Sequence, residues 1–265
     1  MQIINPKDAK DKELIVFDLD GTLSPSKFHI DSEMAELLQQ LLLVKKVAVI
    51  SGGKFEQFEI ELLNPLKDQN ANYQNLFLFP TCSSVGYKYE DDELKLMYAN
   101  YLSEGEVEKI KNAFKQAYEE IGYQDPEKTY GEVVENRKSQ VSFSALGQDI
   151  VNVLGEEGIR QKEIWRTNND VRPQMAEVLK KLLPEFEVRI GGLTTIDITH
   201  KGIDKAYGVE QIQKHLNVPI SKMLFIGDAM FPGGNDHAVI KTGIDYIPIE
   251  GPEETKKIIS NILNI

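Results

Sequence analysis

Short apolar runs alternate with amphipathic stretches along most of the chain. The runs are continuous, and each ends on a charged, hydroxyl, glycine or proline residue. Continuous runs of this length are typical of buried parallel strands. They lie at residues 14–17, 47–50, 76–79 and 223–226, and helical spacing of apolar residues predicts helices over 32–43, 55–63 and 205–216. The pattern predicts an α/β fold with a doubly wound, Rossmann-like and mainly parallel sheet.

The pattern of apolar and polar residues changes between residues 84 and 199. An acidic turn at 90–93 separates two strand-like runs, and a long amphipathic helix is expected over 104–121. Further strands are predicted near 133–135, 141–145, 186–190 and 194–199, with a helix near 172–183. Strand-rich packing inserted into an α/β fold indicates an α+β cap domain. We therefore expect a core of residues 1–83 and 200–265 and a cap of residues 84–199.

Two carboxylates follow the first apolar run. Asp18 and Asp20 stand one residue apart, just before Gly21 and Thr22. Residues i and i+2 of an extended segment point to the same side, so these acids repel each other unless a cation lies between them. Their position at the carboxyl end of a strand is where open α/β sheets bind ligands. Taken alone, the motif fits a Mg²⁺ site and a simple Asp-Gly turn equally well.

Three later segments place polar groups at comparable positions. Ser51 and Gly52 follow the second run, where backbone amides at a helix start attract anions. Lys205 opens a helix, a place that the helix dipole makes unfavourable for a cation unless an anion binds there; we prefer it to Lys201 as a phosphate ligand. Asp228 follows the 223–226 run, and Asn235 and Asp236 close its glycine-rich loop. Each segment alone also fits a turn or a helix cap.

Together these four segments resemble the signatures of the haloacid dehalogenase superfamily of phosphotransferases. The resemblance implies that Asp18 is the nucleophile, forming an aspartyl-phosphate, and that Asp20 is the general acid and base. It further implies phosphate binding by Thr22, Ser51, Gly52 and Lys205. The implied Mg²⁺ ligands are Asp18, Asp20 and Asp228, with Asn235 and Asp236 in the adjoining loop.

A closer resemblance covers most of the chain and is weakest over residues 70–128. Residues 191–205, 232–237 and 251–259 are similar to eukaryotic-type α-phosphomannomutases and to bacterial hydrolases with the same type IIB cap. In that group cap arginines grip a second phosphate, and the first of them matches Arg137. The position of the family's second arginine is Gln148 in this chain, and no counterpart of the third arginine appears over residues 149–159. Thr195 and Asp197 match positions that contact sugar hydroxyls.

That departure favours a phosphatase over a mutase. Reversible binding of a second phosphate suits paired guanidinium groups, which a neutral glutamine does not replace. We therefore predict hydrolysis of a small phosphate monoester such as a sugar phosphate. Isomerisation of hexose phosphates remains the alternative, with Lys138, Arg160 or Arg189 replacing the missing arginine. A non-catalytic regulator that binds a phosphorylated metabolite is a more remote one.

Composition agrees with this interpretation. The 265 residues carry 42 acidic and 30 basic side chains, a net charge of −12, which argues against nucleic acid or an anionic membrane as a partner. The single Cys82 excludes an internal disulfide or a thiolate metal cluster. No apolar run is long enough to span a membrane, and residues 1–12 do not resemble a leader. We expect a cytoplasmic enzyme, either a monomer or a homodimer formed through the cap.

Overall fold

The computed structural model describes residues 3–25, 28–67 and 72–264. The chain divides into two compact units. The core unit comprises Met1–Ala99 and Ile203–Ile265, and the inserted unit comprises Asn100–Gly202. Each unit has a sheet and a hydrophobic core of its own.

A seven-stranded sheet forms the centre of the core unit, in the order β11-β10-β1-β2-β3-β4-β5. The first five strands in this order run parallel, which confirms the predicted α/β class. They are β1 (Leu14–Asp18), β2 (Lys46–Ile50), β3 (Leu76–Phe79), β10 (Met223–Gly227) and β11 (Asp245–Pro248). The antiparallel edge consists of β4 (Val85–Glu90) and β5 (Glu93–Ala99).

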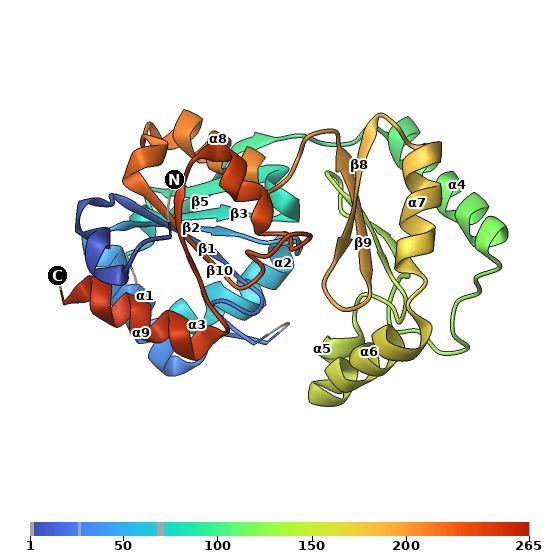
Figure 1. The fold of residues 1–265 in the computed structure, drawn as a ribbon, viewed down its shortest axis with the longest axis horizontal. Coiled ribbons are helices and arrows are strands. Elements are labelled where there is room, and N and C mark those ends of the chain that lie inside the picture. The colour runs from blue at the N-terminus through green and yellow to red at the C-terminus, as the bar shows by residue number, and fades with distance from the viewer. Residues whose placement is uncertain (1–2, 26–27, 68–71, 265) are drawn as a thin grey trace. The chain divides into compact units, whose positions relative to one another are not determined.

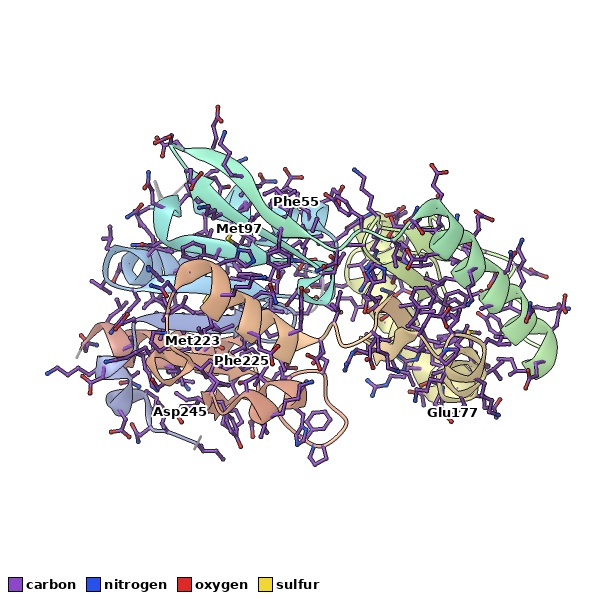
Figure 2. All side chains as sticks on the ribbon, turned by 90° about the horizontal axis from the view of Figure 1, so that it is seen from above. Phe55, Met97, Glu177, Met223, Phe225 and Asp245 are labelled. Atoms are coloured by element: carbon purple, nitrogen blue, oxygen red, sulfur yellow. The ribbon has the colours of Figure 1, made fainter. Side chains whose placement is uncertain are left out.

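Helices cover both faces of this sheet, which explains why its strands are apolar throughout (Figure 1). Ile15 and Phe17 of β1 belong to the cluster that also contains α1 (Ser32–Val44) and α9 (Pro252–Leu263). Leu14 and Val16 alternate with them and pack in the cluster of α8 (Lys205–Leu216). Figure 2 labels Met223 and Phe225 of this second cluster, and also Met97, which packs against the cluster.

The helical segment after β2 changes from α-helical to π-helical geometry near its middle. α2 (Phe55–Phe58) continues as a π-helical turn, η2 (Glu59–Leu63), and then as α3 (Asn64–Lys67). Pro65 has no amide hydrogen to donate to the Glu61 carbonyl, and the amide of Ile30 takes that acceptor at 2.8 Å. The remaining 3₁₀ turns are η1 (Pro6–Asp11), η3 (Tyr73–Asn75), η4 (Thr81–Ser83), η5 (Ile220–Lys222) and η6 (His237–Thr242).

The inserted unit is an antiparallel sheet with helices, in the order β6-β7-β9-β8. Phe143 of the sheet packs with Phe114 and Met175, so α4 and α7 cover one face. Its strands are β6 (Val134–Asn136), β7 (Val141–Ser144), β8 (Phe186–Gly191) and β9 (Thr195–His200), and its helices are α4 (Glu104–Ile121), α5 (Ile150–Leu154), α6 (Glu156–Asn169) and α7 (Arg172–Leu182).

The predicted boundary of the insertion needs one correction. The sequence predicts that the hairpin after residue 84 belongs to the cap, but β4 pairs with β3 through Phe77–Lys88 and Leu78–Tyr87, so the hairpin extends the core sheet. The inserted unit begins at Asn100 and ends at Gly202. No helix within the described ranges has both the length and the apolar character needed to cross a membrane.

Candidate active site

Asp18 and Lys205 form a buried ion pair at the carboxyl end of β1. Asp18 is the last residue of β1, between β10 and β2, and 3% of it is exposed. Lys205 is the first residue of α8, and its Nζ lies 2.5 Å from Asp18 Oδ1. The side chain of Asp204 caps this helix by accepting the amide of Tyr207 at 2.8 Å. Asp18 and Lys205 thus meet although they lie 187 positions apart in the sequence.

Two further carboxylates complete this cluster. The loop after β10 carries Asp228 and Asp236. One carboxylate oxygen from each of Asp18, Asp228 and Asp236 lies within 4.8 Å of the other two. Asp236 is fully buried, pairs with Lys205 Nζ and accepts the amide of Ala229 at 2.9 Å. Asp236 is therefore more central than the sequence indicated. Asn235 lies exposed in the same loop.

The cluster has more negative than positive charge, and the pKa values reflect it. Burial raises the pKa of Asp18 well above its usual value, and Asp236 and Asp228 raise it further against the effect of Lys205. Burial, followed by Asp236, also raises the pKa of Asp228. Burial alone would lower the pKa of Lys205, but Asp18 and Asp236 raise it. Three clustered carboxylates around one lysine fit a hard divalent cation such as Mg²⁺.

The turn after β1 depends on Gly21. Its φ is +85°, and a Cβ atom there would lie 2.6 Å from Asp228 Oδ2, so a side chain would displace the acid. Asp20, half-buried in this turn, is not part of the three-carboxylate group. The Thr22 hydroxyl is buried and has no hydrogen-bond partner among the described residues, which suits a group reserved for a ligand.

Ser51 follows Ile50, the residue of β2 that pairs with Asp18. Its Oγ accepts the amide of Gly53 at 3.0 Å, which leaves the hydroxyl hydrogen for another acceptor. The amides of Thr81 and Cys82 donate to the carbonyls of Gly53 and Ser51 at 2.8 and 2.9 Å. The Ser51–Gly52–Gly53 turn is therefore held from the neighbouring strand end. Lys201, the rejected phosphate ligand, is exposed and lies in the inserted unit.

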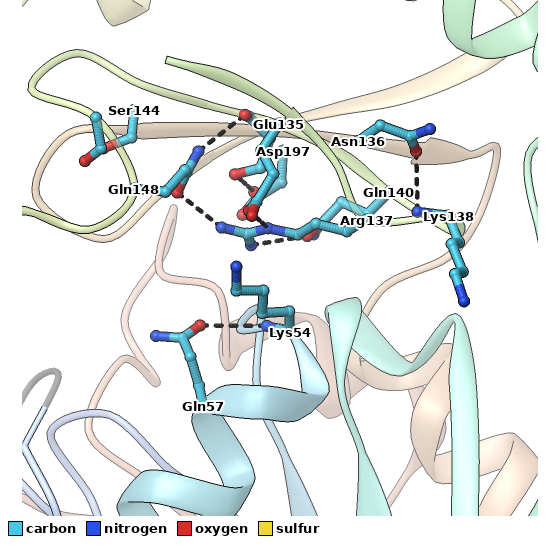
Figure 3. Close-up of polar contacts among 12 residues, drawn as sticks. Lys54, Gln57, Glu135, Asn136, Arg137, Lys138, Gln140, Ser144, Gln148 and Asp197 are labelled. Carbon is cyan, nitrogen blue, oxygen red and sulfur yellow. Dashed lines mark hydrogen bonds and ion pairs between the residues drawn. The ribbon is translucent and has the colours of Figure 1, made fainter. Parts of the chain in front are cut away.

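In the inserted unit, Arg137 is fully engaged by its neighbours (Figure 3). Its Nε donates to Glu135 at 2.7 Å, and its terminal nitrogens donate to Gln140 at 3.1 Å and Gln148 at 2.7 Å. Gln148 in turn donates to the Ser142 carbonyl at 2.9 Å. Sequence reasoning found Arg137 but missed Glu135, although its position two residues earlier in a strand places both on one side.

The other two residues predicted in the insertion, Thr195 and Asp197, both lie on β9. Asp197 accepts the Ser142 hydroxyl at 2.7 Å, and Thr195 donates its hydroxyl to the Gly191 carbonyl at 2.6 Å. The basic residues considered as replacements for the missing arginine are either close to an acid or exposed. Arg189 lies 3.4 Å from Glu187, Arg160 pairs with Glu157 at 2.7 Å, and Lys138 is exposed in a turn.

Comparison with known proteins identifies the family. A model of haloacid dehalogenase-like hydrolases matches residues 15–243. The chain belongs to this family. Among curated relatives, the phosphomannomutase of Saccharomyces cerevisiae is 25% identical over 97% of this chain and 96% of its own length. That of Galdieria sulphuraria is 27% identical over 95% of both chains.

Solved structures share the fold of this haloacid dehalogenase-like chain. An IMP-bound, N-terminally truncated IMP-nucleotidase of Plasmodium falciparum matches with a TM-score of 0.68 at 18% identity, over 96% of this chain and 68% of that one. A haloacid dehalogenase-like hydrolase of Bacteroides thetaiotaomicron matches with a TM-score of 0.61 at 17% identity, over 95% and 99%. These similarities establish the fold. The family match indicates that the protein is a phosphoryl-transfer enzyme.

Proposed function

We propose that this protein is a Mg²⁺-dependent phosphatase that hydrolyses a small phosphate monoester of the sugar phosphate class. The observation that carries the proposal is the cluster of Asp18, Asp228 and Asp236 around Lys205 at the carboxyl ends of β1 and β10. A buried acid next to a lysine and a cation site provides a nucleophile, an anion ligand and charge neutralisation together.

The chemistry runs in two transfers. An Asp18 carboxylate oxygen attacks phosphorus, the P–O bond to the leaving group breaks, and Asp20 donates a proton to the departing oxygen. Asp20 then removes a proton from a water molecule, whose oxygen attacks the same phosphorus and releases Asp18 and inorganic phosphate. Lys205, Ser51, Thr22 and the Gly52 amide hold phosphoryl oxygens throughout. Asp18 and Asp228, with Asp236 adjoining, would hold Mg²⁺, and the ion would supply positive charge for the phosphoryl group.

The inserted unit supports hydrolysis rather than isomerisation. Glu135 balances the charge of Arg137, and a neutral Gln148 occupies the second matching position. A second phosphate would have to displace these contacts without gaining a second guanidinium, and a missing charge pair costs on the order of 2–5 kcal/mol. Asp197 and Thr195 lie in the strand that neighbours Ser142 and suit hydroxyl groups of a sugar.

A second candidate is a phosphomannomutase. The observation in its favour is the similarity, at 24–27% identity over 94–97% of this chain, to several proteins named phosphomannomutase. The sequence difference at Gln148 and the Glu135–Arg137 pair favour the phosphatase. The candidates differ in product, which makes them separable in one experiment.

That experiment supplies hexose 1-phosphates with Mg²⁺ and a catalytic amount of the matching 1,6-bisphosphate. We expect inorganic phosphate to accumulate, with little 6-phosphate isomer. Arg137→Ala should raise KM more than it lowers kcat, because a contact to a part of the substrate other than the reacting phosphorus contributes mostly uniform binding. Efficient isomerisation with little phosphate release would establish the mutase instead.

A further inference from the structure

Glu61 is a buried acid that the proposed chemistry does not use. It lies in the π-helical turn η2, just before the buried Leu62 and Leu63, and only 3% of it is exposed. A carboxyl group held in such surroundings is costly unless hydrogen bonds compensate it. The side chain four residues earlier, Gln57, donates its amide Nε2 to Glu61 Oε1 at 3.3 Å.

Gln57 connects this acid to the turn that carries Ser51. Its Oε1 accepts the amide of Lys54 at 3.2 Å, at the start of α2 (Figure 3). A Cβ atom at Gly53 would overlap this same oxygen, so the glycine allows Gln57 to reach the backbone. Because Glu61 accepts from the nitrogen of the amide, the oxygen of Gln57 faces the backbone rather than the reverse.

The same turn is fixed on its other side. The Gly53 amide donates to Ser51 Oγ at 3.0 Å, and the Gly53 carbonyl accepts from Thr81 at 2.8 Å. Backbone or side-chain polar groups of Ser51, Gly53 and Lys54 are therefore all held by hydrogen bonds. The orientation of the Ser51 hydroxyl depends on this arrangement, because the bond from Gly53 fixes which lone pair is occupied.

We propose that Gln57 and Glu61 are positioning residues that hold the turn 51–54 in the shape needed to bind phosphate. Glu61 orients the Gln57 amide, Gln57 fixes the backbone at Gly53 and Lys54, and that backbone orients Ser51. The inference rests on the proposed function only in assigning Ser51 to phosphate. Pro65 contributes indirectly, because the π-helical turn that precedes it contains Glu61.

The test compares Gln57→Leu, Glu61→Leu and Glu61→Gln with the wild-type protein. Leucine is similar in size to glutamine and glutamate but makes no side-chain hydrogen bonds. Glu61→Gln keeps an acceptor oxygen for Gln57. The matched control is Gln213→Leu, at an exposed position of α8. The measurements are kcat and KM for an aryl phosphate, the Kd of orthovanadate by calorimetry with Mg²⁺ present, and the melting temperature.

We expect Gln57→Leu and Glu61→Leu to raise KM and the orthovanadate Kd by about 5- to 30-fold, the worth of one or two hydrogen bonds. The loss in kcat should be smaller, and Glu61→Gln should recover most of the affinity. Replacing a buried acid by an apolar side chain need not unfold the protein, so the melting temperatures should stay comparable.

The outcomes separate this inference from the proposed function. Unchanged KM and Kd in both leucine variants, whatever their melting temperatures, would overturn the positioning role. A wild-type protein that binds orthovanadate but hydrolyses no phosphate ester would refute the phosphatase, and the Kd comparison would still decide the role of Gln57. Absence of any orthovanadate binding by the wild-type protein would refute both.

Discussion

The two units treat their buried charges differently. In the core unit, Asp18 and Asp236 share the single Lys205, and Asp228 adds a third carboxylate nearby. In the inserted unit, Arg137 and Arg172 each have a carboxylate partner at 2.7 Å. The core site is therefore short of positive charge, whereas Arg137 and Arg172 of the insertion are each balanced by an acid. A cation bound at the core site would gain charge interactions, whereas a group bound at Arg137 would replace hydrogen bonds that already exist.

The largest expected effect follows from removing the attacking charge of the core site. Asp18→Asn is nearly isosteric and should reduce phosphate release to background, since loss of the nucleophile in covalent enzymes costs about 10⁶-fold. It also lessens repulsion among the three acids, so the metal-free protein should not lose stability. The control is Asp91→Asn, the same change at an exposed hairpin turn. Phosphate release near the wild-type rate would rule out the covalent route.

The next effect separates Asp20 from the three-carboxylate group. Asp20→Asn should keep the nucleophile but remove the proton donor, a loss of roughly 10²–10⁴ in rate on a sugar phosphate. Nitrophenyl phosphate needs little protonation of its leaving group and should lose less in the first transfer. Pre-steady-state measurement of nitrophenol release isolates that step. Equal losses on both esters in that step would contradict the assignment.

A smaller effect is expected when the insertion, like the core site, is given unbalanced charge that a ligand can neutralise. Gln148→Arg adds a guanidinium, and Glu135→Gln releases the charge of Arg137 from its partner. The double variant should bind a hexose bisphosphate about 10-fold or more tighter as an inhibitor, because charge-assisted contacts to phosphate are strong. Competitive inhibition constants measure this. Gln161→Arg, on helix α6, is the control, and equal inhibition of all forms would show that charge balance there does not select the ligand.

The smallest effect concerns the stability of the insertion at low pH. Burial alone would raise the pKa of Asp170, but its hydrogen bonds with Arg172 outweigh this and lower the pKa below 3.8. The stabilisation is therefore complete above the unfolded pKa and is lost as the pH falls through the lower, folded value. Asp170→Asn should cost about 1–2 kcal/mol near neutral pH and much less at pH 2–3.

The sequence contains one tryptophan, Trp165, whose ring centroid lies 5.9 Å from the Arg172 guanidinium carbon. Its fluorescence during urea unfolding therefore reports on this unit. A pH-independent difference between Asp170→Asn and the wild-type protein would show that the ion pair is not the source of the effect.

Most of the core could be predicted because its local signals agree. Continuous apolar runs gave the strands, and the polar residues that end them assemble at one edge, as parallel strands require. That rule applies to Asp18, Ser51 and Asp228, which stand at or just after the ends of β1, β2 and β10. Lys205 instead opens α8, and its pairing with Asp18 follows from the position of that helix. The predicted helix over 104–121 was also correct, because a Ser103–Glu106 capping box and a clear apolar stripe mark it.

Two parts of the fold could not be read from local patterns. The hairpin of β4 and β5 has its own turn, and only long-range pairing with β3 decides which sheet it joins. Helix α6 was missed because its buried positions are Gly158, Lys162 and Trp165, which form no apolar stripe. In the site, the place of Asp236 depends on how its loop folds back on Lys205, and spacing alone does not specify that.

The strand order has a consequence for how the protein is made. β1 lies between β2, which follows within about thirty residues, and β10, which the ribosome delivers some two hundred residues later. Until then one edge of an apolar central strand has no partner and invites pairing with other chains. The inserted unit, by contrast, is contiguous in sequence and is complete before β10 emerges. We expect nascent or C-terminally truncated chains to aggregate through the first half of the core, with the insertion already folded.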